Sequence, residues 1–266
     1  MNNKPKTALI TGSYGGLGSA FARIHAKNGG ALIISDLNED RLSEQKELLE
    51  KEYSVPVYTV SADLTKAENT KKIYRFCKDN SLSVDYLICN AGFGGQGSFA
   101  MRDIEKDMAM LAVNVQANTM LLKLFLPDMI SRGSGRVLLV SSISALLPGP
   151  LQAVYFASKA YLKSLGNAIW RELKGTGVTL TTVMPGILAT DFAEKGHLED
   201  TLLFSKRASP KEAAKKAYSA MLKGKMNVSP CVQLPLRLSL PFVPILPKSI
   251  VTGLVFMLQK KRDAFI

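Results

Sequence analysis

The chain has 266 residues, of which 47% are hydrophobic, so it is long enough for one large domain with a well-buried core and too apolar for extended disorder. Three widely spaced cysteines and two histidines offer no metal-ligand or disulfide spacing, so we expect no metal centre and reduced, buried thiols. The first residues lack the apolar segment of a secretory signal, which leads us to expect a cytoplasmic protein.

The net charge of +12 is unevenly distributed along the chain. Residues 1–200 hold 22 Lys and Arg against 20 Asp and Glu, a net +2, whereas residues 201–266 hold 12 against 2, a net +10. Near Asn227 the composition also becomes rich in Pro, Leu, Val and basic residues. We therefore expect a main domain over residues 1–226 and an extension over residues 227–266, packed on that domain, on a partner or on a membrane surface.

Short apolar runs alternate with amphipathic stretches through the first two hundred residues. Six runs are almost continuously apolar or β-branched, as in parallel strands buried on both faces, and lie at residues 8–11, 31–35, 57–60, 86–89, 137–140 and 178–183. The helical patterns between them lie at residues 16–28, 38–52, 65–78, 103–131 and 152–174, with Asn38 and Thr65 as predicted caps. This alternation predicts an α/β fold, a Rossmann-type doubly wound parallel sheet with helices on both faces, followed by an atypical proline-rich basic extension.

The first predicted strand ends in a glycine-rich loop, T-G-S-Y-G-G-L-G at residues 11–18, which opens a helix. Gly12, Gly16 and Gly18 allow a tight turn and a close approach to a pyrophosphate that rests on the helix N-terminus. This order of strand, loop and helix is the context that a dinucleotide-binding motif requires.

Asp36 ends the second predicted strand, eighteen residues after Gly18. A carboxylate at this place can accept hydrogen bonds from the adenosine ribose hydroxyls and would repel a 2′-phosphate. Because no Arg or Lys occupies residues 13–15 or directly follows Asp36, we expect NAD(H) in preference to NADP(H). The alternative is that Asp36 only caps the next helix.

Two further strand ends carry candidate cofactor residues. Asp63 and Leu64, after the third strand, are placed to line an adenine pocket. Asn90 puts a polar side chain at the carboxyl end of the fourth strand, where open α/β sheets bind ligands, although it could also be a simple turn residue.

Tyr155 and Lys159 are four residues apart, and Ser142 lies thirteen residues before Tyr155. In a helix beginning near Gln152, the tyrosine and the lysine would project from the same face. A nearby ammonium group favours the phenolate, which would bring the tyrosine closer to acting as an acid or base at neutral pH. The alternative is an ordinary pair on a helix surface.

In seven motifs the chain resembles the short-chain dehydrogenase/reductase family in its short, single-domain form, over roughly residues 5–215. The motifs occur in the family's order and spacing: T-G-x-x-x-G-x-G at 11–18, A-D-L at 62–64, N-A-G at 90–92, Asn114 in A-V-N-V, Ser142, Y-x-x-x-K at 155–159 and P-G-x-x-x-T at 185–190. The resemblance implies an NAD(P)-dependent oxidoreductase that interconverts a ketone and a secondary alcohol.

The resemblance also implies a catalytic tetrad. Tyr155 would exchange the proton with the substrate oxygen, and Ser142 would donate a hydrogen bond to that oxygen. Lys159 would hold the nicotinamide ribose and lower the pKa of the tyrosine, and Asn114 would hold a water that links the lysine to solvent.

The loop at residues 185–190 resembles the segment that fixes the nicotinamide, with Thr190 on the carboxamide. The full set of expected cofactor-binding residues is Gly12, Ser13, Tyr14, Gly16, Leu17, Gly18, Asp36, Asp63, Leu64, Asn90, Ala91, Gly92, Tyr155, Lys159, Pro185, Gly186, Ile187 and Thr190.

Residues 188–206 occupy the place of the family's substrate lid. Apolar residues here and beyond the strand ends lead us to expect a hydrophobic carbonyl or alcohol substrate: a steroid-like ring system, a fatty 3-oxoacyl thioester or another lipid-like compound. The expected substrate wall consists of Phe93, Leu146, Leu147, Leu198 and Leu202.

The C-terminal extension departs from the family pattern because the usual Asp-Gly-Gly turn is missing, which puts the usual tetramer in doubt and leaves a homodimer through the helices bearing Asn114 and Tyr155. Four prolines lie within residues 234–247, and Pro247 is well placed to begin a helix running to about Lys261. The apolar run at residues 250–258 is far shorter than the roughly 20 residues that span a bilayer.

Two hypotheses therefore remain for the extension. It packs over the substrate site or a partner subunit, or residues 234–262 lie on an anionic membrane surface. We expect no nucleic-acid binding, because Phe242, Phe256 and Phe265 are the only aromatic residues after Tyr218. The rival to an enzyme is a catalytically silent nucleotide-binding sensor or scaffold, but such a protein would be expected to lose the tyrosine or the lysine.

Overall fold

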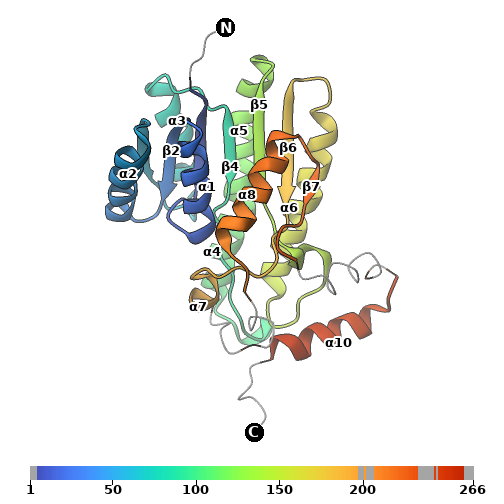
Figure 1. The fold of residues 1–266 in the computed structure, drawn as a ribbon. Coiled ribbons are helices and arrows are strands. Elements are labelled where there is room, and N and C mark those ends of the chain that lie inside the picture. The colour runs from blue at the N-terminus through green and yellow to red at the C-terminus, as the bar shows by residue number, and fades with distance from the viewer. Residues whose placement is uncertain (1–4, 197–200, 202–206, 233–242, 244, 261–266) are drawn as a thin grey trace.

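The predicted apolar runs form neighbouring strands of one parallel sheet in the computed structural model, which describes residues 5–196, 201, 207–232, 243 and 245–260 (Figure 1). The strand order is β3-β2-β1-β4-β5-β6-β7, and all pairs are parallel. The strands are β1 (Thr7–Thr11), β2 (Ala31–Asp36), β3 (Val57–Ser61), β4 (Tyr86–Cys89), β5 (Gly135–Val140), β6 (Val178–Val183) and β7 (Asn227–Val228). The predicted doubly wound α/β fold is confirmed.

Helices cover both faces of the sheet. The helices are α1 (Gly16–Lys27), α2 (Glu39–Tyr53), α3 (Ala67–Asp79), α4 (Ile104–Leu111), α5 (Asn118–Ser131), α6 (Ala153–Glu172), α7 (Phe192–Lys195), α8 (Pro210–Leu222) and α10 (Lys248–Gln259). Shorter turns are η1 (Phe99–Met101), the π-helical η2 (Ala112–Ala117) and η3 (Ile143–Leu146).

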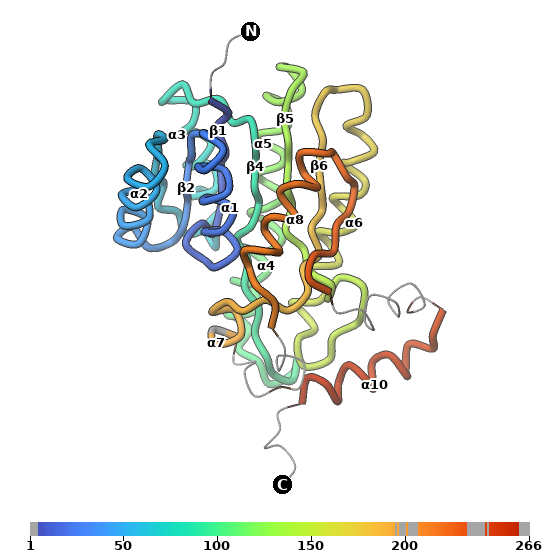
Figure 2. Tube along the Cα trace, viewed as in Figure 1, coloured from blue at the N-terminus to red at the C-terminus, as the bar shows by residue number. Residues whose placement is uncertain are grey.

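Alternation along the strands explains why their sequences are almost continuously apolar. Ala8 and Ile10 of β1 face a core built with α1, α2 and α8, whereas Leu9 faces a second core built with α3, α5 and α6. A strand that is buried on both faces needs apolar side chains in both directions. The tube in Figure 2 shows α1 and α8 lying together on one side of the sheet.

The sheet order places a topological switch point at β1, whose neighbours are β2 and β4. The crossover after β1 leads to β2 on one side, whereas β4 on the other side is reached from β3, and this reversal opens a site at the carboxyl ends of the strands. The loops after β1 and β4 therefore meet at one edge of the sheet. The predicted catalytic and cofactor residues lie along this edge.

Two helix starts test the predicted caps. Asn38 caps α2 by accepting a hydrogen bond from the Arg41 amide at 3.0 Å, as predicted. The predicted cap at Thr65 is wrong, because α3 begins at Ala67 and Thr65 instead donates its hydroxyl and its amide to the Asp63 carboxylate.

The predicted helix at residues 103–131 is continuous but contains the π-helical segment η2. Its 28 residues from Ile104 to Ser131 are long and apolar enough to cross a membrane by composition alone. Leu121, Phe125 and Met129 are nevertheless buried in the core against the sheet, so the apolar pattern is that of a central helix of the fold.

The C-terminal helix α10 begins directly after Pro247, as predicted, and ends at Gln259 (Figure 1). Its Val251 and Val255 pack in a small core with Phe156 and Val243, which Leu147 and Tyr155 border. The described part of the extension therefore packs on the domain beside Tyr155.

Candidate active site

The glycine loop after β1 has the backbone shape that a dinucleotide site requires. Gly12 has a φ of +63°, in the left-handed region that favours glycine. A side chain at Gly18 would place its Cβ 2.1 Å from the Gly12 carbonyl oxygen, so the turn closes only around glycine. No side chain caps the start of α1 after Gly15, so its first backbone amides could donate to the pyrophosphate of a bound dinucleotide.

Asn90 holds this loop from the neighbouring strand. Its Nδ2 donates to the carbonyl oxygens of Thr11 at 3.0 Å and Gly12 at 2.9 Å. The backbone amides of Asn90 and Ala91 in turn donate to the Thr11 hydroxyl, each at 3.2 Å. The Asn90 side chain therefore holds the glycine loop in place, a contact that a simple turn residue would not make.

Ser13 is buried, and its hydroxyl donates to Oε1 of Gln45 at 2.9 Å, while Nε2 of Gln45 donates to the Ser13 carbonyl at 2.8 Å. Gln45, in α2, was not expected at this site. The sequence did carry a signal for it, because Gln45 is a polar residue on the helix face that Leu42 and Leu49 make apolar.

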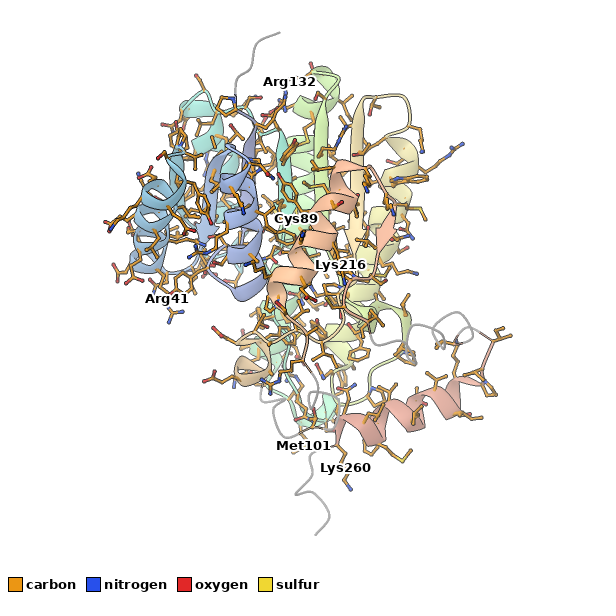
Figure 3. All side chains as sticks on the ribbon, in the orientation of Figure 1. Arg41, Cys89, Met101, Arg132, Lys216 and Lys260 are labelled. Atoms are coloured by element: carbon orange, nitrogen blue, oxygen red, sulfur yellow. The ribbon has the colours of Figure 1, made fainter. Side chains whose placement is uncertain are left out.

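Asp36 lies beside the same loop. Its two carboxylate oxygens accept from the Tyr14 amide at 3.1 Å and the Leu37 amide at 2.8 Å. The alternative that Asp36 caps the next helix is wrong, because Asn38 does so. Arg41, which was not expected here, places its guanidinium 4.9 Å from the Tyr14 ring centroid, so a cation also stands beside the adenosine end (Figure 3).

Asp63 is held by Thr65, whose hydroxyl donates to the carboxylate at 2.7 Å. This hydrogen bond is the largest influence that keeps the pKa of Asp63 below its ordinary value. Leu64, beside it, is half-buried against the core. Both residues stand at the carboxyl end of β3, in line with the predicted adenine side of the site.

Asn114 and Lys159 converge on Gly92, in the loop after β4. A Cβ at Gly92 would lie 2.9 Å from Oδ1 of Asn114 and 3.0 Å from Nζ of Lys159. Asn114 is fully buried within η2, and π-helical segments of this kind are frequent at functional sites. Its Oδ1 accepts from the Phe93 amide at 3.0 Å, and its Nδ2 donates to Oγ of Ser158 at 3.0 Å.

Tyr155 and Lys159 lie one turn apart on α6, with Nζ of the lysine 5.8 Å from the tyrosine ring centroid. Lys159 is only 4% exposed, so the alternative of an ordinary helix surface pair is wrong. Its Nζ donates to the Val140 carbonyl oxygen at 3.1 Å. Burial lowers the pKa of Lys159 from 10.5 to about 8.

The pKa of Tyr155 differs from the expectation, because it is raised above its ordinary value. Desolvation of the phenol is the largest cause, and the nearby hydroxyl groups of Ser142 and Ser144 oppose it. Desolvation disfavours the phenolate more than these hydroxyl groups favour it. The neutral phenol, which can donate a proton, is therefore the favoured form of Tyr155.

The serines around Tyr155 connect the end of β5 to α6. Ser142 caps η3 by accepting from the Ser144 amide at 3.2 Å, and Ser141 donates its hydroxyl to the Lys159 carbonyl at 2.7 Å. Ser158 donates to the Tyr155 carbonyl at 2.7 Å. Ser144 and Ser158 were not expected at the site, although each is within two residues of a predicted tetrad member.

The loop after β6 is clamped by the segment that follows β7. The Gly186 amide donates to the Pro230 carbonyl at 3.0 Å, and a Cβ at Gly186 would lie 2.3 Å from the Cys231 carbonyl oxygen. Pro185 accepts from the Ile143 amide at 3.2 Å.

The same loop also reaches the glycine loop and α7. A Cβ at Gly16 would lie 2.8 Å from Cγ2 of Thr190, whose hydroxyl accepts from the Phe192 amide at 3.4 Å. Ile187 accepts from the Ala208 amide at 2.8 Å. The loop after β6 thus faces the glycine loop, as a nicotinamide-binding segment must.

Apolar side chains border the tetrad. Phe192, which was not expected as a wall residue, places its ring centroid 5.3 Å from that of Tyr155. Phe93 directly follows Gly92, and Leu146 and Leu147 follow Ser142 by four and five residues. All three side chains are half-buried. Leu198 and Leu202 lie outside the described residues.

A group of lysines lies apart from the tetrad, on and after α8. Lys215, Lys216, Lys223 and Lys225 line a hollow of about 740 Å³ between α8 and β7, and Figure 3 labels Lys216. Within the described part of the chain, no group of three His, Cys, Asp or Glu side chains could hold a metal ion.

The residues present fit a dinucleotide bound along the carboxyl edge of the sheet. The glycine loop and the uncapped start of α1 fit its pyrophosphate, and Asp36 fits the adenosine ribose. Gly92 keeps the space beside the Lys159 ammonium and the Asn114 amide free of a side chain.

Comparisons with known proteins agree with this geometry. The family model of the short chain dehydrogenases matches residues 6–200. A 3-oxoacyl-(acyl-carrier-protein) reductase, FabG, of Rickettsia conorii is 32% identical over 191 residues, which cover 71% of this chain and 76% of that protein.

Two solved structures share the fold. A short-chain dehydrogenase from Sphingobium yanoikuyae in complex with NADPH has a TM-score of 0.81 and 22% identity, with 98% of each chain covered. A short chain dehydrogenase/reductase from Burkholderia phymatum in complex with NAD has a TM-score of 0.80 and 20% identity, with 92% of this chain and 93% of that chain covered.

Proposed function

The chain belongs to the short-chain dehydrogenase/reductase family, oxidoreductases that act on CH–OH groups with NAD(P), and we propose that it interconverts a hydrophobic ketone and its secondary alcohol with Tyr155 as acid and base. The observation that supports this most is the meeting of Tyr155 with buried Lys159, Ser142 and Ser144 beside the glycine loop. A silent sensor would not need a buried lysine at this place, since its burial is unfavourable.

Tyr155 acts on the substrate oxygen. In reduction its phenol donates a proton to the carbonyl oxygen, and in oxidation the phenolate takes the proton from the hydroxyl. The Ser142 hydroxyl donates a hydrogen bond to the same oxygen, where negative charge develops in the transition state. The bound nicotinamide supplies or accepts the hydride.

Lys159 provides the positive charge of the site. With a pKa of about 8 it is largely protonated at pH 7, and its ammonium stabilises the phenolate that forms as the proton leaves Tyr155. Asn114 and Ser158 position this helix turn through the hydrogen bond between Nδ2 and Oγ. A water held by Asn114, linking the lysine to solvent, stays a prediction.

We further propose NAD(H) as the preferred cofactor. The Asp36 carboxylate would accept from the adenosine ribose hydroxyls and repel a 2′-phosphate, and its place beside the Tyr14 amide supports this. Arg41 is the cation that could favour NADP(H) instead. Titration of the purified protein with NADH and with NADPH, followed by nucleotide fluorescence, decides the matter; tighter binding of NADPH would contradict the proposal.

The proposed substrate is large and apolar. Phe192 beside Tyr155, with Phe93, Leu146 and Leu147, supports an apolar wall around the reacting oxygen, and the FabG relative is named a 3-oxoacyl-(acyl-carrier-protein) reductase. Loss of NADH absorbance should be followed with steroid ketones, 3-oxoacyl thioesters and acetone as a small control. A higher kcat/KM for acetone than for every large apolar ketone would contradict this substrate class.

Other features stay predictions. These are the division into residues 1–226 and 227–266, a homodimer through the helices that bear Asn114 and Tyr155, a cytoplasmic location and contact with an anionic membrane through residues 234–262. Met108 and Tyr161, on α4 and α6, are exposed and would be covered in such a dimer.

A further inference from the structure

Helix α10 has two apolar stripes instead of one. Val251, Val255 and Gln259 recur at helical spacing and are buried against the domain. Ile250, Leu254 and Met257 form a second stripe and are 61%, 54% and 62% exposed. A surface helix of a soluble domain normally turns a polar face to water, so the outer stripe points to a contact.

A second segment adds apolar side chains at the same end of the molecule. Phe99 and Met101 of η1 and Ile104 of α4 are 70%, 85% and 68% exposed. Figure 3 labels Met101 and Lys260 at this end.

Hydrogen bonds join this second segment to α10. Arg102 donates to the Gln96 carbonyl at 2.9 Å, and the Gln96 side chain donates to the Gln259 carbonyl at the end of α10. Side chains from two distant parts of the sequence are therefore exposed at the same end of the molecule, and together they are called the η1–α10 surface: Phe99, Met101, Ile104, Ile250, Leu254 and Met257.

The η1–α10 surface lies next to the reacting group. The inner stripe of α10 contacts the cluster that Tyr155, Phe156 and Leu147 form, and the Gln152 side chain at the start of α6 donates to Oε1 of Gln259. The exposed stripe therefore lies on the opposite side of α10 from the core that Tyr155 borders. Whatever the surface binds is held beside the site.

Charge and length indicate what the surface binds. Residues 227–266 contain five Lys and Arg against one Asp, a net +4, and no acidic residue occurs within residues 245–260. Lys248 and Lys260 stand at the two ends of α10. A helix of twelve residues cannot span a bilayer, but an apolar helix flanked by lysines can lie in an anionic membrane interface.

A second copy of the chain fits this surface less well. A symmetric contact places identical surfaces against each other, and antiparallel α10 helices would bring Lys248 of each copy towards Lys260 of the other. Anionic lipid headgroups instead bring negative charge to both ends of α10.

We infer that the η1–α10 surface docks on an anionic bilayer, holding the substrate side of the tetrad at the membrane so that the enzyme acts on a ketone or alcohol dissolved in lipid. This inference rests on the proposed function and names the source of its substrate. It extends the predicted membrane contact of the tail to η1 and α4, whose apolar residues were not expected to take part.

The test is flotation of the full-length protein with vesicles of phosphatidylcholine alone and of phosphatidylcholine with phosphatidylglycerol. We expect binding to the anionic vesicles, and a loss of roughly tenfold or more in the triple variant Ile250→Asn, Leu254→Asn, Met257→Asn. A matched control replaces three exposed apolar residues elsewhere, Leu48→Asn, Ile130→Asn, Leu222→Asn, and should float like wild type.

Two further measurements separate this inference from the proposed function. Both triple variants should bind NADH like wild type and keep activity on a water-soluble ketone, while only the α10 variant loses the gain in rate on a vesicle-borne ketone. Equal flotation of wild type and the α10 variant overturns the docking surface even if the enzyme is active. So does a wild-type dimer that floats with neither vesicle and that the α10 variant converts to a monomer, because the partner is then a second copy.

Discussion

Replacing Lys159 by methionine should change how stability depends on pH. Lys159 is 4% exposed, and burial lowers its pKa from 10.5 to about 8 in the folded protein. The unfolded chain therefore binds more protons than the folded protein between these two pH values, so the free energy of unfolding of the wild type rises with pH across this interval. Below pH 8 the buried ammonium of Lys159 lowers the free energy of unfolding by its full amount, about 3 kcal/mol.

The methionine side chain of the variant has no such titration, so the comparison isolates the lysine. Loss of the hydrogen bond to the Val140 carbonyl destabilises Lys159→Met at every pH, but this cost does not vary with pH. Between pH 7 and pH 10 the wild type should therefore gain about 2 kcal/mol of stability over the variant, whichever protein is more stable at pH 7.

Urea denaturation followed by fluorescence of Trp170, the single tryptophan, measures both proteins at the two pH values. The exposed Lys215→Met of α8 also removes one ammonium group and is the control, which should follow the wild-type profile. If the wild type and Lys159→Met show parallel changes between pH 7 and pH 10, then Lys159 is not the strained, buried cation that the proposed mechanism uses.

Three further changes probe the cofactor site and the C-terminal helix. Asp36→Ala should reduce the preference for NADH over NADPH by roughly tenfold, because it removes the repulsion of a 2′-phosphate; an unchanged ratio of dissociation constants would count against the assigned role. Gly18→Ala, whose Cβ would lie 2.1 Å from the Gly12 oxygen, should weaken NADH binding in calorimetric titration, while Gly253→Ala, with no atom within 4 Å, should leave it intact. Gln152→Ala removes the hydrogen bond to Gln259, so amide hydrogen exchange should quicken in α10 and stay unchanged in β1 and β4.

Local patterns predicted the framework of the site. The strand, glycine loop and helix at residues 7–27 follow from apolar periodicity and from positions that only glycine can occupy, as Gly12 and Gly18 show. The Asn38 cap was predictable because the hydrogen bond of a cap involves residues three apart. Thr65 carried the same signal but does not cap α3, because its hydroxyl and its amide both donate to the Asp63 carboxylate.

Features that depend on packing could not be predicted in this way. The raised pKa of Tyr155 follows from burial of the phenol, which outweighs the nearby hydroxyl groups of Ser142, which a motif did show, and Ser144, which none did. Arg41 reaches Tyr14 only because α2 begins beside the glycine loop. The two stripes of α10 could not be told apart in the sequence. Only the packing of Phe156 and Val243 against Val251 and Val255 distinguishes the side chains that face the domain from those that stay exposed.

The assignment of Tyr155 as the acid and base is tested most directly by single-turnover and steady-state reduction of an apolar ketone with NADH in wild type and Tyr155→Phe. The account predicts that the variant binds NADH with unchanged affinity and folds normally, but loses kcat by roughly a hundredfold or more, the range that general acid catalysis contributes. A Tyr155→Phe protein that reduces the ketone at the wild-type rate would contradict the account.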